Sequence, residues 1–235
     1  MNDQDNAAGM ASVPASRDGQ SSSRMKIGYR AAWVILHVFF GLYLRWKVYN
    51  RERVPLTGPV ILACNHASFL DPPLVGTALP RGIYYLARQS LFRFPVLGPG
   101  LRYLDAIPVD RQAGASGLKA ILDRLFEGGA IILFPEGTRS PDGNFLPARS
   151  GIGLAVIKSD APVVPVRIFG SNRAWGRPHR LPRPRKVIVK FGHAIDFSAL
   201  RQEAKTAPKN RLKEIYQEVA DGIMAEIGRL KPEPD

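Results

Sequence analysis

The sequence predicts an α/β fold, in which a mostly parallel central sheet is flanked by helices and preceded by an N-terminal, membrane-associating helical segment. Short apolar runs recur from Val60 onward, and several of them are separated by stretches with helical periodicity. An aromatic-rich apolar segment precedes all of these runs. Strands that alternate with helices are typical of parallel sheets covered on both faces.

The composition indicates one domain with a sizeable core and an anionic partner. The chain has 235 residues, of which 45% are apolar, and a formal net charge of +13. Such a charge attracts polyanions, which include nucleic acid, anionic lipid surfaces and acidic carrier proteins. The one cysteine, Cys64, excludes an intramolecular disulfide, and its apolar surroundings predict a small buried side chain.

The chain divides into three predicted parts. Residues 1–24 are small and polar without apolar periodicity, which predicts a disordered tail and not a signal peptide. Residues 25–52 contain the apolar run from Ala31 to Leu44, which is rich in aromatic residues and has basic residues at both ends. A spanning helix needs about 20 apolar residues, so this run predicts a helix lying in the headgroup region. The alternative is a buried amphipathic helix of a soluble core. Residues 53–235 are predicted to form the α/β domain.

The elements of this domain follow from its apolar patterns. Five runs are predicted to be buried strands: VILAC (60–64), GIYYLA (82–87), AIILF (130–134), VVPVRIF (163–169) and KVIVKFG (186–192). Helical spacing predicts helices over residues 116–129, 151–160 and 211–230. Residues 171–186 carry six Arg or Lys, no acidic residue and several prolines, which predicts a surface loop.

The stretch NHASFLDPP directly after the run at 60–64 is the first candidate site, because sites in open α/β sheets gather beyond the carboxyl ends of strands. His66 precedes Asp71 by five residues, and a strand-to-helix turn can bring the carboxylate to the imidazole, which fixes its tautomer. The sequence has no G-x-S-x-G nucleophile elbow. A base here would therefore act directly on a substrate hydroxyl. On spacing alone, a polar strand end with a core histidine is the alternative.

Two further turns follow apolar runs. FPEGTRS (134–140) offers Glu136, Gly137, Thr138 and Arg139, where glycine permits close approach of a ligand and arginine suits a phosphate. The alternative is a Glu136–Arg139 ion pair that closes the turn. DAIPVDR (105–111) ends in Arg111, which would complete a phosphate clamp, although a lone arginine after a strand is usually solvated.

Other templates do not match. Tyr103 stands where G-x-G-x-x-G needs its third glycine, and no G-x-x-x-x-G-K-[ST] occurs. His66 and Asp71 are too few ligands for a metal site. We therefore expect neither a metal nor a bound cofactor.

The stretches NHASFLD, DAIPVDR, FPEGTRS and VVPVRIFG occur in one order, and together this set resembles the four motifs of the lysophospholipid/glycerolipid acyltransferase family. The resemblance implies that His66 is the catalytic base and Asp71 its orienting carboxylate. It also implies an α/β domain, often preceded by an N-terminal helical pair that docks on the membrane.

The resemblance further implies an acceptor-binding role for Arg111, Glu136, Gly137 and Arg139, with Thr138 in the same turn. Pro165 in the fourth motif would lie on the acyl-donor side. Two departures concern the acceptor: Ala148–Arg149 stands where the family often has Phe-Lys, and Ala106–Ile107–Pro108 stands where a glycine and an aromatic are frequent.

The expected activity is transfer of a fatty acyl group from acyl-CoA or acyl carrier protein to lysophosphatidic acid, giving phosphatidic acid for phospholipid biosynthesis. The alternatives are another lysolipid acceptor, such as an ornithine lipid, and a lipid or thioester hydrolase using the same His–Asp dyad. Nucleic-acid binding is a third hypothesis that rests on the net charge and on residues 171–186, but this stretch offers only Trp175 for base stacking, which argues against it. We expect binding to the cytoplasmic face of the cell membrane, peripheral or monotopic, through Ala31 to Leu44 and residues 171–186.

Overall fold

The computed structural model describes residues 27–95, 97–103, 105–109 and 114–235. The predicted disordered tail, residues 1–24, and Arg111 therefore lie outside the described residues.

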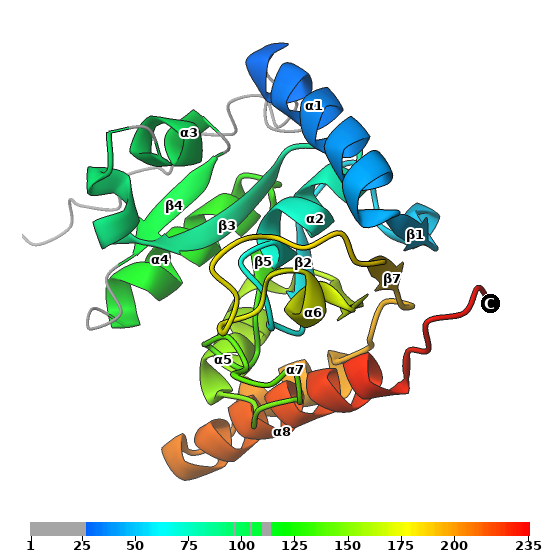
Figure 1. The fold of residues 1–235 in the computed structure, drawn as a ribbon. Coiled ribbons are helices and arrows are strands. Elements are labelled where there is room, and N and C mark those ends of the chain that lie inside the picture. The colour runs from blue at the N-terminus through cyan, green and yellow to red at the C-terminus, as the bar shows by residue number, and fades with distance from the viewer. Residues whose placement is uncertain (1–26, 96, 104, 110–113) are drawn as a thin grey trace, which may run out of the picture.

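A seven-stranded sheet forms the centre of the described part of the molecule, in the order β1-β7-β6-β2-β5-β3-β4 (Figure 1). Neighbouring strands are parallel except for the β6–β7 pair, so the predicted mostly parallel sheet is confirmed. All five predicted strands are present. The strands are β1 (Lys47–Tyr49), β2 (Val60–Cys64), β3 (Ile83–Arg88), β4 (Ala106–Val109), β5 (Ala130–Leu133), β6 (Val163–Phe169) and β7 (Ile188–Phe191).

Helices flank the sheet on both faces, and the three helices predicted in the α/β domain are present as α4, α5 and α8. The α-helices are α1 (Ile27–Leu44), α2 (Asp71–Ala78), α3 (Leu97–Tyr103), α4 (Gly114–Phe126), α5 (Ser150–Ser159), α6 (Ser171–Trp175), α7 (Ser198–Ala204) and α8 (Lys209–Arg229). Two 3-10 turns, η1 (Arg51–Arg53) and η2 (Gln89–Arg93), complete the elements of the described residues.

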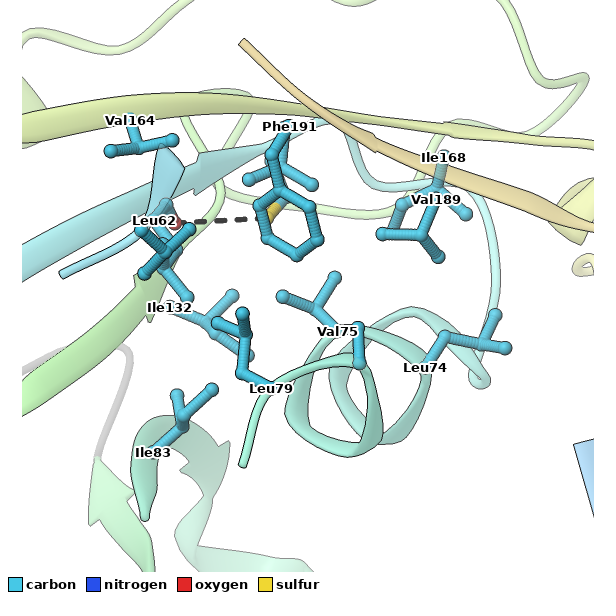
Figure 2. Packing of buried hydrophobic residues seen from close by; sticks show 14 of the residues in the cluster. Leu62, Leu74, Val75, Leu79, Ile83, Ile132, Val164, Ile168, Val189 and Phe191 are labelled. Carbon is cyan, nitrogen blue, oxygen red and sulfur yellow. Dashed lines mark hydrogen bonds between the residues drawn. The ribbon is translucent and has the colours of Figure 1, made fainter. Parts of the chain in front are cut away.

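The first core layer packs α2 against one face of the sheet. Figure 2 shows Leu74 and Val75 of α2 facing Val189 and Phe191 of β7, and all four side chains are fully buried. Leu62 of β2 belongs to the same layer. Because residues alternate along a strand, this layer takes every second side chain of β2 and leaves the others for the opposite face.

The second core layer packs α4, α5 and α8 against the opposite face. Ile61 and Ala63 of β2 lie here, together with Val156 of α5 and Ile223 of α8. The two helices α5 and α8 approach so closely that a Cβ at Gly153 would lie 1.9 Å from the backbone oxygen of Tyr216. Only glycine permits that approach.

Helix α1 is anchored to the core along one side only. Phe40 and Leu44 are buried, and Trp33 Nε1 donates a hydrogen bond to the Leu79 oxygen at 3.1 Å. The opposite side is apolar and exposed, formed by Val34, Ile35, Val38, Phe39 and Leu42. Among the described residues, no helix has the length and apolar character needed to cross a membrane.

Two details of the fold differ from the expected element positions. Strand β1 lies within residues 25–52, so the sheet already includes part of the segment predicted to associate with the membrane. The prediction that residues 171–186 form a loop throughout is wrong for the first five, which form α6. This helix is held by tertiary contacts that local sequence does not encode, including the buried side chain of Ala174.

Candidate active site

The candidate site starts where β2 ends. The side chain of Asn65 pairs with the backbone of Ile168 on β6, with Oδ1 accepting from the amide at 2.7 Å and Nδ2 donating to the oxygen at 3.2 Å. The side chain thus continues the hydrogen bonding of the sheet after the strand has stopped, and it fixes the point at which His66 emerges. Sequence reasoning missed this role. The available signal was an asparagine directly after a buried strand.

His66 and Asp71 form the predicted pair. Nδ1–H of His66 donates to Oδ2 of Asp71 at 2.9 Å, with the imidazole 16% exposed and the carboxylate fully buried. Because a carboxylate only accepts, this bond places the proton on Nδ1. Nε2 is left as the nitrogen that can accept a proton from a substrate.

The same Asp71 oxygen shapes the turn around His66. Oδ2 also accepts from the amides of Ala67 and Ser68, both at 2.7 Å. Asp71 is the first residue of α2, where Pro72 and Pro73 are tolerated because first-turn amides have no intrahelical partner. The carboxylate therefore holds the loop as well as the imidazole.

Neighbouring side chains restrain the imidazole and supply no nucleophile. The ring of Phe134 stacks on His66 with centroids 3.9 Å apart. The Ser68 hydroxyl is buried, donating to the Trp175 oxygen at 2.8 Å and accepting from the Leu70 amide at 3.0 Å. Cys64 is buried as predicted, and burial raises the pKa of its thiol well above the usual range. These geometries favour a base that acts on substrate without a covalent enzyme intermediate.

The side chain of Glu136, in the turn after β5, binds the backbone of His66. Its Oε1 accepts from the His66 amide at 2.7 Å, and its Oε2 accepts from the Leu146 amide at 3.0 Å. The side chain is buried, which raises the pKa of the carboxyl, while the two amide bonds oppose that shift. Both oxygens are thus engaged by the polypeptide, and the contacts are those of a positioning residue.

The rest of this turn also contacts His66. The Ser140 amide donates to the His66 oxygen at 2.7 Å, so residues 136–140 hold the histidine backbone on both sides. Gly137 has φ of 66°, and a Cβ there would lie 2.8 Å from Cδ of Arg149. A side chain at position 137 would therefore collide with the arginine that follows the turn.

Arg139 lies over an aromatic ring of the first turn. Its guanidinium carbon is 3.4 Å from the centroid of Phe69, which is itself 51% exposed. The ring of Phe69 in turn contacts that of Trp175, with centroids 5.4 Å apart. Stacking of this kind fixes the position of the guanidinium above the ring.

The other residues predicted for the site do not all lie beside His66. Thr138 accepts a hydrogen bond from Arg177 Nη2 at 2.9 Å, a partner that sequence reasoning missed. Pro165 is buried inside the sheet, where its Cα pairs with Ala63, three residues before His66. Arg111 lies outside the described residues, and within those residues no cluster of potential ligands could hold a metal ion.

The chain is similar to known acyltransferases over much of its length. The model of the family described as Acyltransferase matches residues 45–169. The chain is 30% identical over 176 residues to a 1-acyl-sn-glycerol-3-phosphate acyltransferase of Bacillus subtilis (strain 168), covering 72% of this chain and 87% of that protein.

Two further similarities extend over different lengths. A 1-acyl-sn-glycerol-3-phosphate acyltransferase of Cocos nucifera is 28% identical over 147 residues, which cover 61% of this chain and 48% of that protein. The chain thus spans about half the length of this plant relative. The crystal structure of the 1-acyl-sn-glycerophosphate acyltransferase PlsC from Thermotoga maritima superposes with a TM-score of 0.63 at 24% identity, covering 86% of this chain and 83% of that one. This last likeness shows a shared fold.

Proposed function

The chain belongs to the acyltransferase family, and on that premise we propose that it transfers a fatty acyl group from an acyl thioester to the free hydroxyl of lysophosphatidic acid, giving phosphatidic acid. The observation that carries the proposal is the hydrogen bond from His66 Nδ1 to the buried Asp71 carboxylate. The turn at 136–140 lies beside this pair, because the Ser140 amide binds the His66 backbone oxygen. The names of the Bacillus and Cocos relatives support the acceptor.

The chemical step uses His66 as general base. Nε2 accepts the proton of the acceptor hydroxyl while that oxygen attacks the thioester carbonyl, and the charge that develops on the imidazolium is stabilised by Asp71. Collapse of the tetrahedral intermediate breaks the carbon–sulfur bond, and the imidazolium returns its proton to the leaving thiolate. The new ester leaves with the acceptor, and the histidine is restored for the next cycle.

Arg139 orients the acceptor by binding its phosphate, and in this proposal Gly137 and Thr138 form the backbone and hydroxyl surface beside it. In 1-acyl-sn-glycerol 3-phosphate the free hydroxyl and the phosphate are on adjacent carbons. A phosphate held at the turn therefore places the hydroxyl near His66, because residues on both sides of Arg139 bind the histidine backbone. Glu136 supports this arrangement by positioning His66 and does not itself contact the phosphate.

The membrane supplies the lipid acceptor, and we propose that α1 docks on it. Its exposed apolar side would enter the headgroup region, while the basic residues 176–186 would face anionic lipids on the cytoplasmic side. Tyr43 of α1 donates a hydrogen bond to the Pro182 oxygen at 2.9 Å, which joins the two surfaces. The donor would be acyl-CoA or acyl carrier protein, with its acyl chain approaching the side on which Pro165 lies.

The decisive experiment supplies purified protein with a radiolabelled acyl thioester and a panel of lysolipids in vesicles. We expect labelled phosphatidic acid from lysophosphatidic acid in preference to products from ornithine lysolipids. Release of free fatty acid irrespective of acceptor would identify a hydrolase. Preferential labelling of another lysolipid would correct the acceptor and retain the reaction.

A further inference from the structure

Beyond residues 136–140, a second element is fixed to the active-site rim. Helix α6 is held by the hydrogen bond from Ser68 Oγ to the Trp175 oxygen, and by one of 3.1 Å from Asn172 Nδ2 to the Asp142 oxygen. At Gly176 the chain turns so tightly that a Cβ would lie 2.5 Å from the Asn172 oxygen. These contacts therefore fix the position of the start of the basic segment 176–186 beside the site.

The first side chain beyond this turn reaches residues 136–140. Arg177 Nη2 donates to Thr138 Oγ1 at 2.9 Å, while the Arg177 residue as a whole is exposed. A hydroxyl partner occupies one N–H of the five that a guanidinium carries. The remaining donors are available to a ligand at the turn.

Three guanidinium groups gather around the same turn. Arg139 belongs to it, Arg149 lies against Gly137, and Arg177 binds Thr138. Within the described residues, neither Arg149 nor Arg177 forms an ion pair with a carboxylate.

Two carboxylates of the described residues near the turn are engaged elsewhere. Glu136 binds two backbone amides, and Asp142 binds Ser140 and Asn144. Arg149 and Arg177 therefore bring two positive charges to the turn that no carboxylate of the described residues pairs with, and an anionic ligand can balance them.

We infer that Arg177 is a phosphate-binding residue of the acceptor site and sets its preference for a phosphate monoester. The inference rests on the proposed function, which it deepens. A phosphate monoester carries a charge of about −1.5 to −2 near neutral pH and has three acceptor oxygens. A phosphodiester carries a single charge and has two free oxygens, so it gains less from an added guanidinium. Arg177 thus favours lysophosphatidic acid over lysolipids whose phosphate bears a head group.

The test compares Arg177→Gln with Arg180→Gln, which removes the same charge from an exposed position of the same segment. Within the described residues Arg180 makes no hydrogen bond or ion pair through its side chain. For Arg177→Gln we expect the KM for lysophosphatidic acid in vesicles to rise about tenfold, the loss of one charge-assisted bond. The kcat and the KM for the acyl thioester should stay at their wild-type values. Arg180→Gln removes one charge from the same proposed membrane-facing segment, so any change in the acceptor KM that it causes reports the membrane contribution and should be much smaller than the tenfold rise for Arg177→Gln.

Small competitors then test the monoester preference directly. Methyl phosphate, a monoester, should inhibit Arg177→Gln about tenfold less well than the wild type. Dimethyl phosphate, a diester, should lose less potency than methyl phosphate does. Equal effects of the two substitutions on acceptor KM would overturn the inference, as would a rise in the donor KM alone, which would place Arg177 on the donor's phosphates. A wild-type chain that fails to acylate lysophosphatidic acid would reject the proposed function, and the inference with it.

Discussion

The guanidinium of Arg139 rests 3.4 Å above the centroid of the Phe69 ring, so the turn after β5 is stacked on the turn after β2. Phe69 belongs to the loop that Asp71 organises. The arginine proposed to bind the acceptor phosphate is therefore positioned by the same loop that carries the proposed base, and the Trp175 ring packs beside Phe69.

Replacing Arg139 with alanine should raise the KM for lysophosphatidic acid by about 10- to 100-fold, as expected for loss of a charge-assisted phosphate contact. The KM for the acyl donor should change far less. Steady-state kinetics with each substrate varied in turn measures both constants. Arg102→Ala is the matched control, because its guanidinium lies over the Phe92 ring away from the turn. Equal changes in both KM values would argue against a phosphate role for Arg139.

Replacing His66 with alanine should lower kcat by at least about 100-fold, the contribution of a positioned general base. The fold should persist, because the backbone bonds to Glu136 and Ser140 do not involve the imidazole. Acyl transfer and the circular dichroism spectrum report the two effects. His193→Ala, at an exposed position, should match the wild type. Wild-type turnover by His66→Ala would exclude the dyad from the mechanism.

The buried carboxyl of Glu136 should make a specific contribution to the pH dependence of stability. Because burial raises its pKa in the folded state above 4.5, the folded chain holds this proton more tightly than the unfolded chain does. Its contribution to the free energy of unfolding is therefore largest at low pH and falls as the pH rises from 4.5 through the raised pKa.

Urea unfolding of the wild type and Glu136→Gln across this pH range measures that contribution. The stability advantage of the wild type should shrink as the pH rises. Glu52→Gln, which changes an exposed carboxyl, should follow the wild-type curve in shape. Parallel curves for the wild type and Glu136→Gln would contradict the expectation.

Replacing Leu42 with glutamate should weaken binding to anionic vesicles about ten- to 100-fold, because Leu42 is 81% exposed on the apolar side of α1 and burial of a leucine contributes about 1.5–3 kcal/mol. Vesicle flotation measures the bound fraction. Phe126→Glu provides the control, since Phe126 is 69% exposed on α4, away from α1. Equal release of both variants would show that binding does not use α1 in particular.

The sequence predicted the fold well where strands are buried on both faces. The runs at 60–64, 130–134 and 163–169 lie in the middle of the sheet, where both faces demand apolar side chains. Strand β1 has only three residues at the sheet edge, and its burial pattern is mixed, so no periodicity could identify it. The antiparallel pairing of β6 with β7 likewise depends on topology and leaves no trace in composition.

The candidate site was less predictable in detail. The spacing of His66 and Asp71 indicated a pair, and the structure brings them within hydrogen-bonding distance. The motif FPEGTRS does not indicate that both carboxylate oxygens of Glu136 accept hydrogen bonds from backbone amides. The two donors, His66 and Leu146, belong to other segments of the chain. Arg177 was hidden in the same way, as one of five arginines in residues 171–186, until the fold placed it against Thr138.

Residues 136–140 bind both the amide and the carbonyl oxygen of His66, and these two hydrogen bonds limit how this protein can be re-engineered. Transplanting that turn from a homologue with a different acceptor would also move the histidine, so altered specificity would come with impaired turnover. Residues 177–186 offer a safer place for design, since Arg177 reaches the turn through its side chain alone. Directed evolution of new acceptor preferences should therefore begin at position 177, where the library can vary recognition while the histidine backbone keeps its own supports.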